Sequence, residues 1–191
     1  MNSDLQAKGI LDQAEILIPA EQVQTAVANI ACKLNAALTG TCPLVLSVMG
    51  GAVVFTGQLL PQLTFPLDFD YIHVSRYGNS QEGGSLNWKV EPRENVSGRI
   101  VLVLDDLLDE GETLAAIRQR VMALGASRLY SAVFAVKQMK KTRPVHADFF
   151  GVELPCRFVF GFGMDIQGKW RNLPAIYALR EKQAQTHIIN K

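Results

Sequence analysis

The chain has 191 residues, of which 48% are hydrophobic and 19% are charged, enough for one globular domain with a substantial core. Its 19 basic and 18 acidic residues leave a net charge of +1, which gives no support for binding a nucleic acid or a membrane surface. The three cysteines are far apart in the sequence, which favours a reducing compartment and argues against a zinc site.

The N-terminal part of the chain predicts a protein without targeting or membrane segments. The first residues lack the basic end and apolar core of a signal peptide, so we expect a cytoplasmic protein.

Residues 16–18 predict a short extended segment, and apolar residues at helical spacing predict a helix over residues 21–38. Residues 44–48 then predict a buried strand, followed by a glycine turn and a second helix over residues 53–60.

Two further strands are expected around a polar, glycine-rich segment. The strands cover residues 67–74 and 86–90, and the sequence RYGNSQEGGS lies between them. That segment is too long for a tight hairpin, and polar loops of this kind can act as lids. We therefore expect residues 74–90 to form the two arms of a mobile flap.

The stretch RIVLVLDDLLDEGETLAAIRQRVMAL, residues 99–124, predicts a strand, an acidic loop and a helix. The helix N-terminus offers unpaired N–H groups and a positive dipole end, and with the Thr113 hydroxyl these form a phosphate pocket. Asp105 and Asp106 are candidates for binding ribose hydroxyls or, through water, a magnesium ion. Asp109 lies beside the same pocket and is a candidate general base.

The last third of the chain predicts short strands and loops. A strand is expected over residues 129–136, and the basic residues after it, including Arg143, are expected in a solvated loop. Short strands are expected over residues 149–152, 157–160 and 176–179.

The block LVLDDLLDEGETL closely resembles the phosphoribosyl-pyrophosphate (PRPP) motif of the type I phosphoribosyltransferases. That motif runs as four apolar residues, two acids, two apolar residues, and then Asp-Thr-Gly-x-Thr-Leu. Only Glu110 departs from it, because the family has Thr or Ser there. The resemblance implies a catalytic role for Asp109 and assigns PRPP binding to Asp105, Asp106, Glu110, Gly111, Glu112 and Thr113.

The segment RFVFGFGMD resembles the purine-binding segment of the hypoxanthine-guanine phosphoribosyltransferases. The resemblance implies that Phe158 stacks on the purine, that the backbone of Val159 binds its edge, and that Asp165 lies nearby. Lys137 matches the family lysine that donates to the oxygen at the purine six-position. An ammonium there accepts hypoxanthine or guanine and disfavours adenine, whose amino group cannot accept the bond.

Three further matches concern pyrophosphate and the flap. Arg171 matches the family arginine that binds pyrophosphate. Met49 and Gly50 match the first loop, in which a non-proline cis peptide turns an N–H toward pyrophosphate, although Met49 replaces a basic residue and keeps only the backbone role. Arg76 and Tyr77 stand where the family has a Ser-Tyr pair on its flap.

The resemblance covers residues 16–179 and implies an α/β fold: a twisted, mostly parallel sheet with helices on both faces. It implies one domain over residues 1–191, with a core over about residues 20–147 and a small hood from the N-terminal segment and about residues 148–180.

The expected reaction converts a purine and PRPP into a nucleoside monophosphate and pyrophosphate. Magnesium is expected at Asp105, Asp106 and Asp165, and the family commonly forms homodimers or homotetramers. Two alternatives stay open: a xanthine-preferring enzyme, and a non-catalytic regulator that senses PRPP or a nucleotide.

Overall fold

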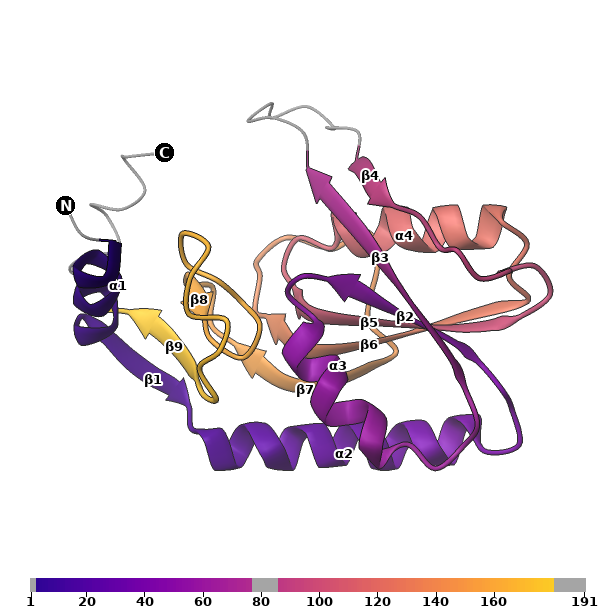
Figure 1. The fold of residues 1–191 in the computed structure, drawn as a ribbon, viewed down its shortest axis with the longest axis horizontal. Coiled ribbons are helices and arrows are strands. Elements are labelled where there is room, and N and C mark those ends of the chain that lie inside the picture. The colour runs from indigo at the N-terminus through magenta and orange to yellow at the C-terminus, as the bar shows by residue number, and fades with distance from the viewer. Residues whose placement is uncertain (1–2, 77–85, 181–191) are drawn as a thin grey trace.

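The computed structural model describes residues 3–76 and 86–180, which form two sheets and their covering helices (Figure 1). The helices are α1 (Ser3–Asp12), α2 (Ala20–Leu38), α3 (Val53–Leu59), the short 3-10 helix η1 (Leu60–Gln62) and α4 (Glu112–Ala123). The strands are β1 (Ala14–Ile18), β2 (Leu44–Met49), β3 (Asp68–Arg76), β4 (Leu86–Val90), β5 (Ile100–Leu108), β6 (Arg128–Lys137), β7 (Phe149–Leu154), β8 (Val159–Phe160) and β9 (Ile176–Leu179).

The larger sheet has six strands in the order β4-β3-β2-β5-β6-β7. Five of them run parallel, and β4 pairs antiparallel with β3 at one edge. The predicted twisted, mostly parallel sheet is therefore confirmed. Because β2 and β5 are neighbours, the loops that leave their carboxyl ends lie at the same edge of the sheet, where ligands of such folds bind.

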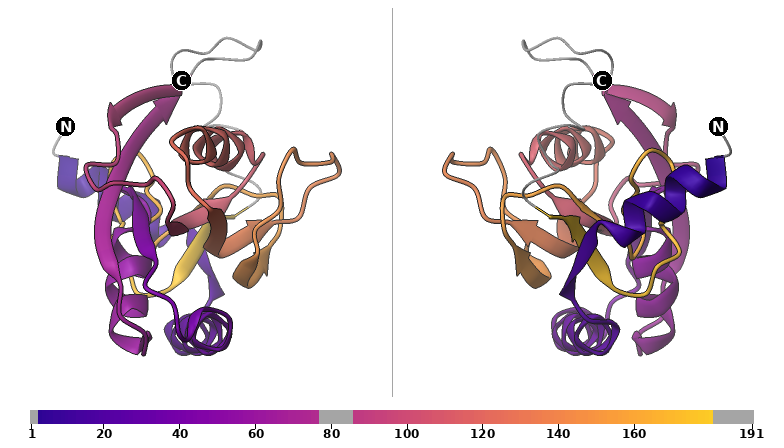
Figure 2. Two further views of the ribbon diagram at one scale, coloured as in Figure 1. Left: turned by 90° about the vertical axis from the view of Figure 1, so that its right-hand side faces the viewer. Right: turned by 90° about the vertical axis from the view of Figure 1, so that its left-hand side faces the viewer.

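Helices cover both faces of this sheet, as Figure 2 shows for α2 and α4. Alternate residues of β5 divide between the two layers: Leu102 and Leu104 pack in the cluster that contains α2 and α3. Val101 and Val103 pack with the buried side of α4. This double burial explains why the strand is a continuous apolar run. Among the helices that the structure describes, none is long and apolar enough to cross a membrane.

The smaller sheet has three antiparallel strands in the order β1-β9-β8, and α1 lies beside it (Figure 1). The hood stays a prediction, and β7, which begins at the residues where the hood was expected to start, pairs with β6 in the larger sheet. Helix α1 was not expected from the sequence. Its Ile10 is buried with residues of the smaller sheet, and Trp170 Nε1 donates to the Ala7 carbonyl at 2.9 Å.

Strand β5 is longer than the predicted strand, which changes the setting of its acids. Pairing with β6 continues through Leu108↔Val136, so Asp105 and Asp106 lie in the strand and not in the predicted acidic loop. The two strands predicted on either side of the glycine-rich segment are confirmed as β3 and β4, which pair antiparallel, and their role as arms of a flap stays a prediction. Tyr77 and the side chain of Arg76, which were assigned to the flap, lie outside the described residues.

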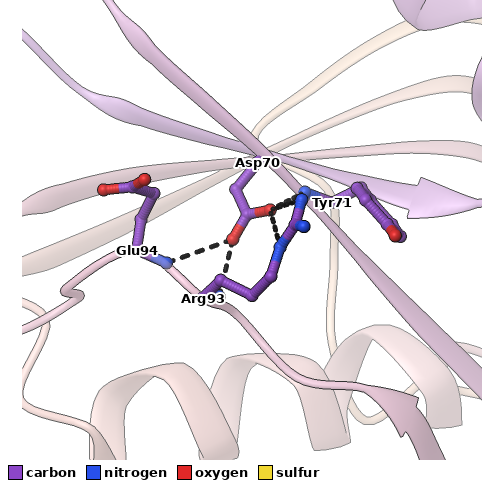
Figure 3. Close-up of polar contacts among 4 residues, drawn as sticks. All are labelled: Asp70, Tyr71, Arg93 and Glu94. Atoms are coloured by element: carbon purple, nitrogen blue, oxygen red, sulfur yellow. Dashed lines mark hydrogen bonds and ion pairs between the residues drawn. The ribbon is translucent and has the colours of Figure 1, made fainter.

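Asp70 of β3 contacts the segment that follows β4 (Figure 3). Its buried carboxylate accepts backbone N–H groups from Arg93 at 2.6 Å, Tyr71 at 2.8 Å and Glu94 at 3.2 Å, and it pairs with the Arg93 guanidinium at 3.2 Å. Burial by itself raises the pKa of Asp70, but these hydrogen bonds outweigh it and lower the pKa below its usual value. Asp70 therefore binds the chain that follows β4 to the first part of β3.

Candidate active site

A pocket of about 260 Å³ lies at the carboxyl ends of β2 and β5. The end of β5, the loop after it and the first turn of α4 supply most of its lining, and the remaining lining residues are Val48, Met49, Gly51, Val74 and Arg171. The predicted PRPP-binding residues among the lining are Met49, Asp105, Asp106, Glu110, Gly111, Thr113 and Arg171, together with the predicted catalytic Asp109. The predicted Gly50 and Glu112 are not among the lining residues. Residues that are distant in the sequence thus converge on one cavity.

The loop between β5 and α4 has the form expected of a phosphate site. Gly111 has a φ of 86°, a left-handed conformation that side chains rarely adopt, and this turns the chain from the strand into the helix. The Gly111 carbonyl accepts the first helical hydrogen bond from Ala115 N at 2.9 Å. The hydroxyl-bearing Thr113 follows in the first turn and lines the pocket, where the helix dipole favours an anion.

Asp105 and Asp106 place two carboxyl groups at the base of the pocket. Asp105 is only 8% exposed, and one of its oxygens accepts the Asp106 N–H at 3.0 Å. Burial, followed by the charge of Asp106, raises the pKa of Asp105 well above its usual value. Burial also raises the pKa of Asp106, although hydrogen bonds and the positive charge of Arg171 oppose this. Both carboxyl groups would be stabilised in the ionised form by a cation.

Two neighbouring buried carboxyl groups are unusual in a protein interior, and they are suited to binding a magnesium ion. Magnesium prefers oxygen ligands and commonly takes only one or two carboxylates from the protein, keeping water and ligand oxygens in its other positions. Within residues 3–76 and 86–180, no three Asp, Glu, His or Cys side chains gather as a complete metal site. Asp105 and Asp106 could therefore hold such an ion only together with water or a bound ligand.

Asp109 and Lys137 meet where β5 and β6 end. Lys137 Nζ donates to Asp109 Oδ2 at 2.6 Å, and the exposed fractions of the two side chains are 13% and 43%. Parallel pairing of the two strands brings these residues together although 28 positions separate them. The pair presents a proton acceptor beside a cationic donor, which suits the edge of a flat ligand that carries both kinds of group.

Arg143 corrects the prediction of a purely solvated basic loop. Its Nε donates to the Asp109 carbonyl at 2.5 Å, and its Nη2 donates to the Lys137 carbonyl. Its side chain also passes Gly111, where an added Cβ would lie 3.5 Å from Arg143 Cβ. Sequence reasoning missed this residue because nothing in the spacing of a polar loop tells which of its cations folds back onto the site.

Arg171 lines the pocket from the segment between β8 and β9. Its guanidinium donates to the Gly163 carbonyl at 2.6 Å and pairs with Asp165 at 2.5 Å. Gly163 has a φ of 98°, and a Cβ there would lie 2.0 Å from the Gly51 carbonyl oxygen. The turn after β8 therefore packs directly on the loop after β2, and in that loop the predicted cis peptide is present between Met49 and Gly50.

The other predicted purine-binding residues, Phe158, Val159 and Asp165, are not among the residues that line the pocket. Phe158 exposes 48% of its surface just before β8, although large aromatic side chains are usually buried. Val159 is buried in β8. Asp165 contacts Arg171 and accepts the Gly168 N–H at 2.7 Å, so its carboxylate is not grouped with Asp105 and Asp106.

Comparison with known proteins identifies a matching family and several relatives. Residues 14–167 match the phosphoribosyl transferase domain family. The chain is 31% identical to a hypoxanthine-guanine phosphoribosyltransferase of Bacillus subtilis, covering 88% of this chain and 94% of the relative. It is 30% identical to a hypoxanthine-guanine-xanthine phosphoribosyltransferase of Tritrichomonas foetus, covering 89% of this chain and 93% of the relative. A crystal structure of a hypoxanthine-guanine phosphoribosyltransferase from Bacillus anthracis superimposes with a TM-score of 0.82 at 28% identity, covering 87% of this chain and 98% of the other.

Proposed function

Because the chain belongs to the phosphoribosyl transferase domain family, we propose that it transfers the phosphoribosyl group of PRPP to hypoxanthine or guanine. The products are the nucleoside monophosphate, IMP or GMP, and pyrophosphate, as expected for purine salvage. The contact of Asp109 with Lys137 beside the phosphate loop carries this proposal. The phosphate loop is the site for a sugar phosphate, and the adjacent Asp109–Lys137 pair is the site that distinguishes oxopurines.

PRPP occupies the 260 Å³ pocket in this proposal. The 5′-phosphate lies against the backbone of residues 109–113 and the Thr113 hydroxyl, at the positive end of α4. The ribose hydroxyls bind Asp105 and Asp106. The pyrophosphate lies between the Met49–Gly50 peptide and Arg171, whose guanidinium already lines the pocket.

Magnesium is the cofactor that we assign to this site. Asp105 and Asp106 would hold it through their carboxylate oxygens, together with water or PRPP. When bound, the ion supplies positive charge that stabilises the leaving pyrophosphate. Asp165 contributes only if its contact with Arg171 opens, because that carboxylate is engaged in the free protein.

The purine edge is read by the Asp109–Lys137 pair. In an oxopurine, N7 and the oxygen at the six-position are adjacent, so one carboxylate and one ammonium in contact can address both. Asp109 accepts the N7 proton as the bond from N9 to the ribose forms, and Lys137 donates to the oxygen. The exposed ring of Phe158 stacks on the purine, and the Val159 backbone binds its edge.

Other parts of the proposal concern the surroundings of the reaction. In this proposal the arms β3 and β4 belong to a flap that excludes water, which would otherwise hydrolyse PRPP. The enzyme works in the cytoplasm as a homodimer or homotetramer, with PRPP and a purine base as its ligands and without a nucleic acid or membrane partner.

Product analysis tests the function directly. The protein is incubated with PRPP, magnesium and, separately, hypoxanthine, guanine, xanthine and adenine, and nucleotide and pyrophosphate are measured. We expect equal amounts of both products with hypoxanthine or guanine and little with adenine. Preference for xanthine would instead favour a xanthine-preferring enzyme; xanthine also stands in the name of the Tritrichomonas relative. Binding of PRPP without any product would favour a regulator and contradict the proposal.

A further inference from the structure

We propose that Arg143 is a positioning residue that aligns Asp109 with Lys137 for purine recognition, an inference that rests on the proposed function. Arg143 acts through the backbone of these two residues and makes no contact with the reacting atoms. It belongs to a loop that the sequence presents only as polar and basic.

The place of Arg143 in the sheet explains what it does. The last paired residues of β5 and β6 are Leu108 and Val136, so the backbone pairing between these strands stops immediately before Asp109 and Lys137. At this point the Arg143 guanidinium donates to both carbonyls, through Nε to Asp109 and through Nη2 to Lys137. One side chain therefore continues the connection between the two strand ends after the ladder has stopped.

Arg143 can do this because its own segment is held on the site. A Cβ atom added at Gly111 would lie 3.4 Å from Val145 and 3.5 Å from Pro144. The segment that follows Arg143 therefore packs on the phosphate loop. Further along, Asp148 accepts the Ser131 N–H at 2.7 Å and the Ser131 hydroxyl at 2.8 Å. Asp148 also pairs with Arg118 of α4 at 3.3 Å. The arginine thus projects from a segment with contacts to β6 and α4.

The chemistry of the side chain makes this role specific for arginine. A guanidinium is planar and offers five N–H donors in a fixed fork, so it can bridge two carbonyls whose spacing it then sets. An ammonium carries the same charge on one atom and lacks this geometry. Since Asp109 and Lys137 must address adjacent purine atoms, a small change in the separation of their backbones should weaken purine binding and proton transfer together.

Steady-state kinetics with Arg143→Ala and Arg143→Lys test the proposal. We expect kcat/KM for hypoxanthine to fall roughly 10- to 100-fold in Arg143→Ala, with KM for PRPP changed by less than about threefold. Arg143→Lys should recover little, because charge without the fork does not bridge the carbonyls. The matched control is Lys141→Ala, which removes an exposed cation from the same loop and should keep wild-type kinetics.

A second background separates positioning from a general loss of structure. In Lys137→Met protein, Arg143→Ala should cost much less than in wild type, since one of the two groups it aligns is already absent. An equal loss in both backgrounds, an equal rise in KM for PRPP, or full activity of Arg143→Lys would overturn the proposal. If the wild type formed no nucleotide with any purine, the function itself would fail. Wild-type activity with an unaffected Arg143→Ala would overturn only this inference.

Discussion

Replacing Lys137 by methionine removes the ammonium but keeps an unbranched side chain of similar length. In the free protein the ammonium lies 2.6 Å from Asp109 Oδ2 and is only 13% exposed, so its position is well defined. When a purine is bound, the same group is expected to donate to the oxygen at the six-position. Lys137→Met should therefore weaken the use of hypoxanthine and guanine and leave the PRPP site nearly intact.

The size of the effect follows from the bond that is lost. A hydrogen bond to a charged group contributes about 1.5–3 kcal/mol, which corresponds to roughly 10- to 150-fold in kcat/KM for the purine. The folded protein should lose little stability, because Asp109 is 43% exposed and an ion pair that water reaches on one side contributes at most about 1 kcal/mol. Melting temperature should accordingly change by only a few degrees.

Initial rates measured with either substrate varied in turn would check this prediction. KM for hypoxanthine should rise while KM for PRPP stays within about twofold of wild type. Lys141→Met is the matched control, because it makes the same chemical change at an exposed position of the following loop. If Lys137→Met used hypoxanthine as well as wild type, Lys137 would not be the residue that reads the purine oxygen.

Three further predictions concern carboxylates. Asp109→Asn should lower kcat by about 10²- to 10⁴-fold with little change in KM. A loss of kcat below about threefold in rapid-mixing assays would mean that Asp109 has only a structural role. Asp105→Asn should stabilise the free protein at pH 7 yet weaken PRPP binding with magnesium. As pH rises above 3.8, Asp105 ionises in the unfolded chain at a lower pH than in the folded chain, so the stability of the wild type falls until the raised pKa of the folded state is passed. If urea unfolding at pH 7 showed no higher free energy of unfolding for Asp105→Asn than for wild type, this reasoning would be contradicted. The lowered pKa of Asp70 has the opposite sign, because its contribution is present above pH 3.8 and is lost as pH falls through the folded pKa. Asp70→Asn should therefore cost about 1–3 kcal/mol at pH 7 and less in acid, and equal losses at both pH values would argue against the hydrogen-bonded carboxylate as the cause.

Local sequence was sufficient to predict the elements that carry the proposed phosphate site. The apolar run of β5, the left-handed Gly111 and the helical spacing of α4 each act within a few residues, so their pattern predicted strand, turn and helix in order. The prediction of the purine-binding residues has a different basis. Phe158 and Lys137 were assigned by resemblance to a known family, and their spacing alone did not indicate a site.

The tertiary structure decided which distant residues meet. The length of β5 depends on its pairing with β6, and this pairing cannot be predicted from the sequence of β5 alone. Helix α1 is held by contacts such as that of Trp170 with the carbonyl of Ala7, 163 positions away. Arg143 lies in a loop whose sequence resembles ordinary surface, yet its guanidinium bridges the ends of two strands. Periodicity and turn signals describe interactions between near neighbours in the chain, whereas these contacts form only after the sheet has brought distant segments together.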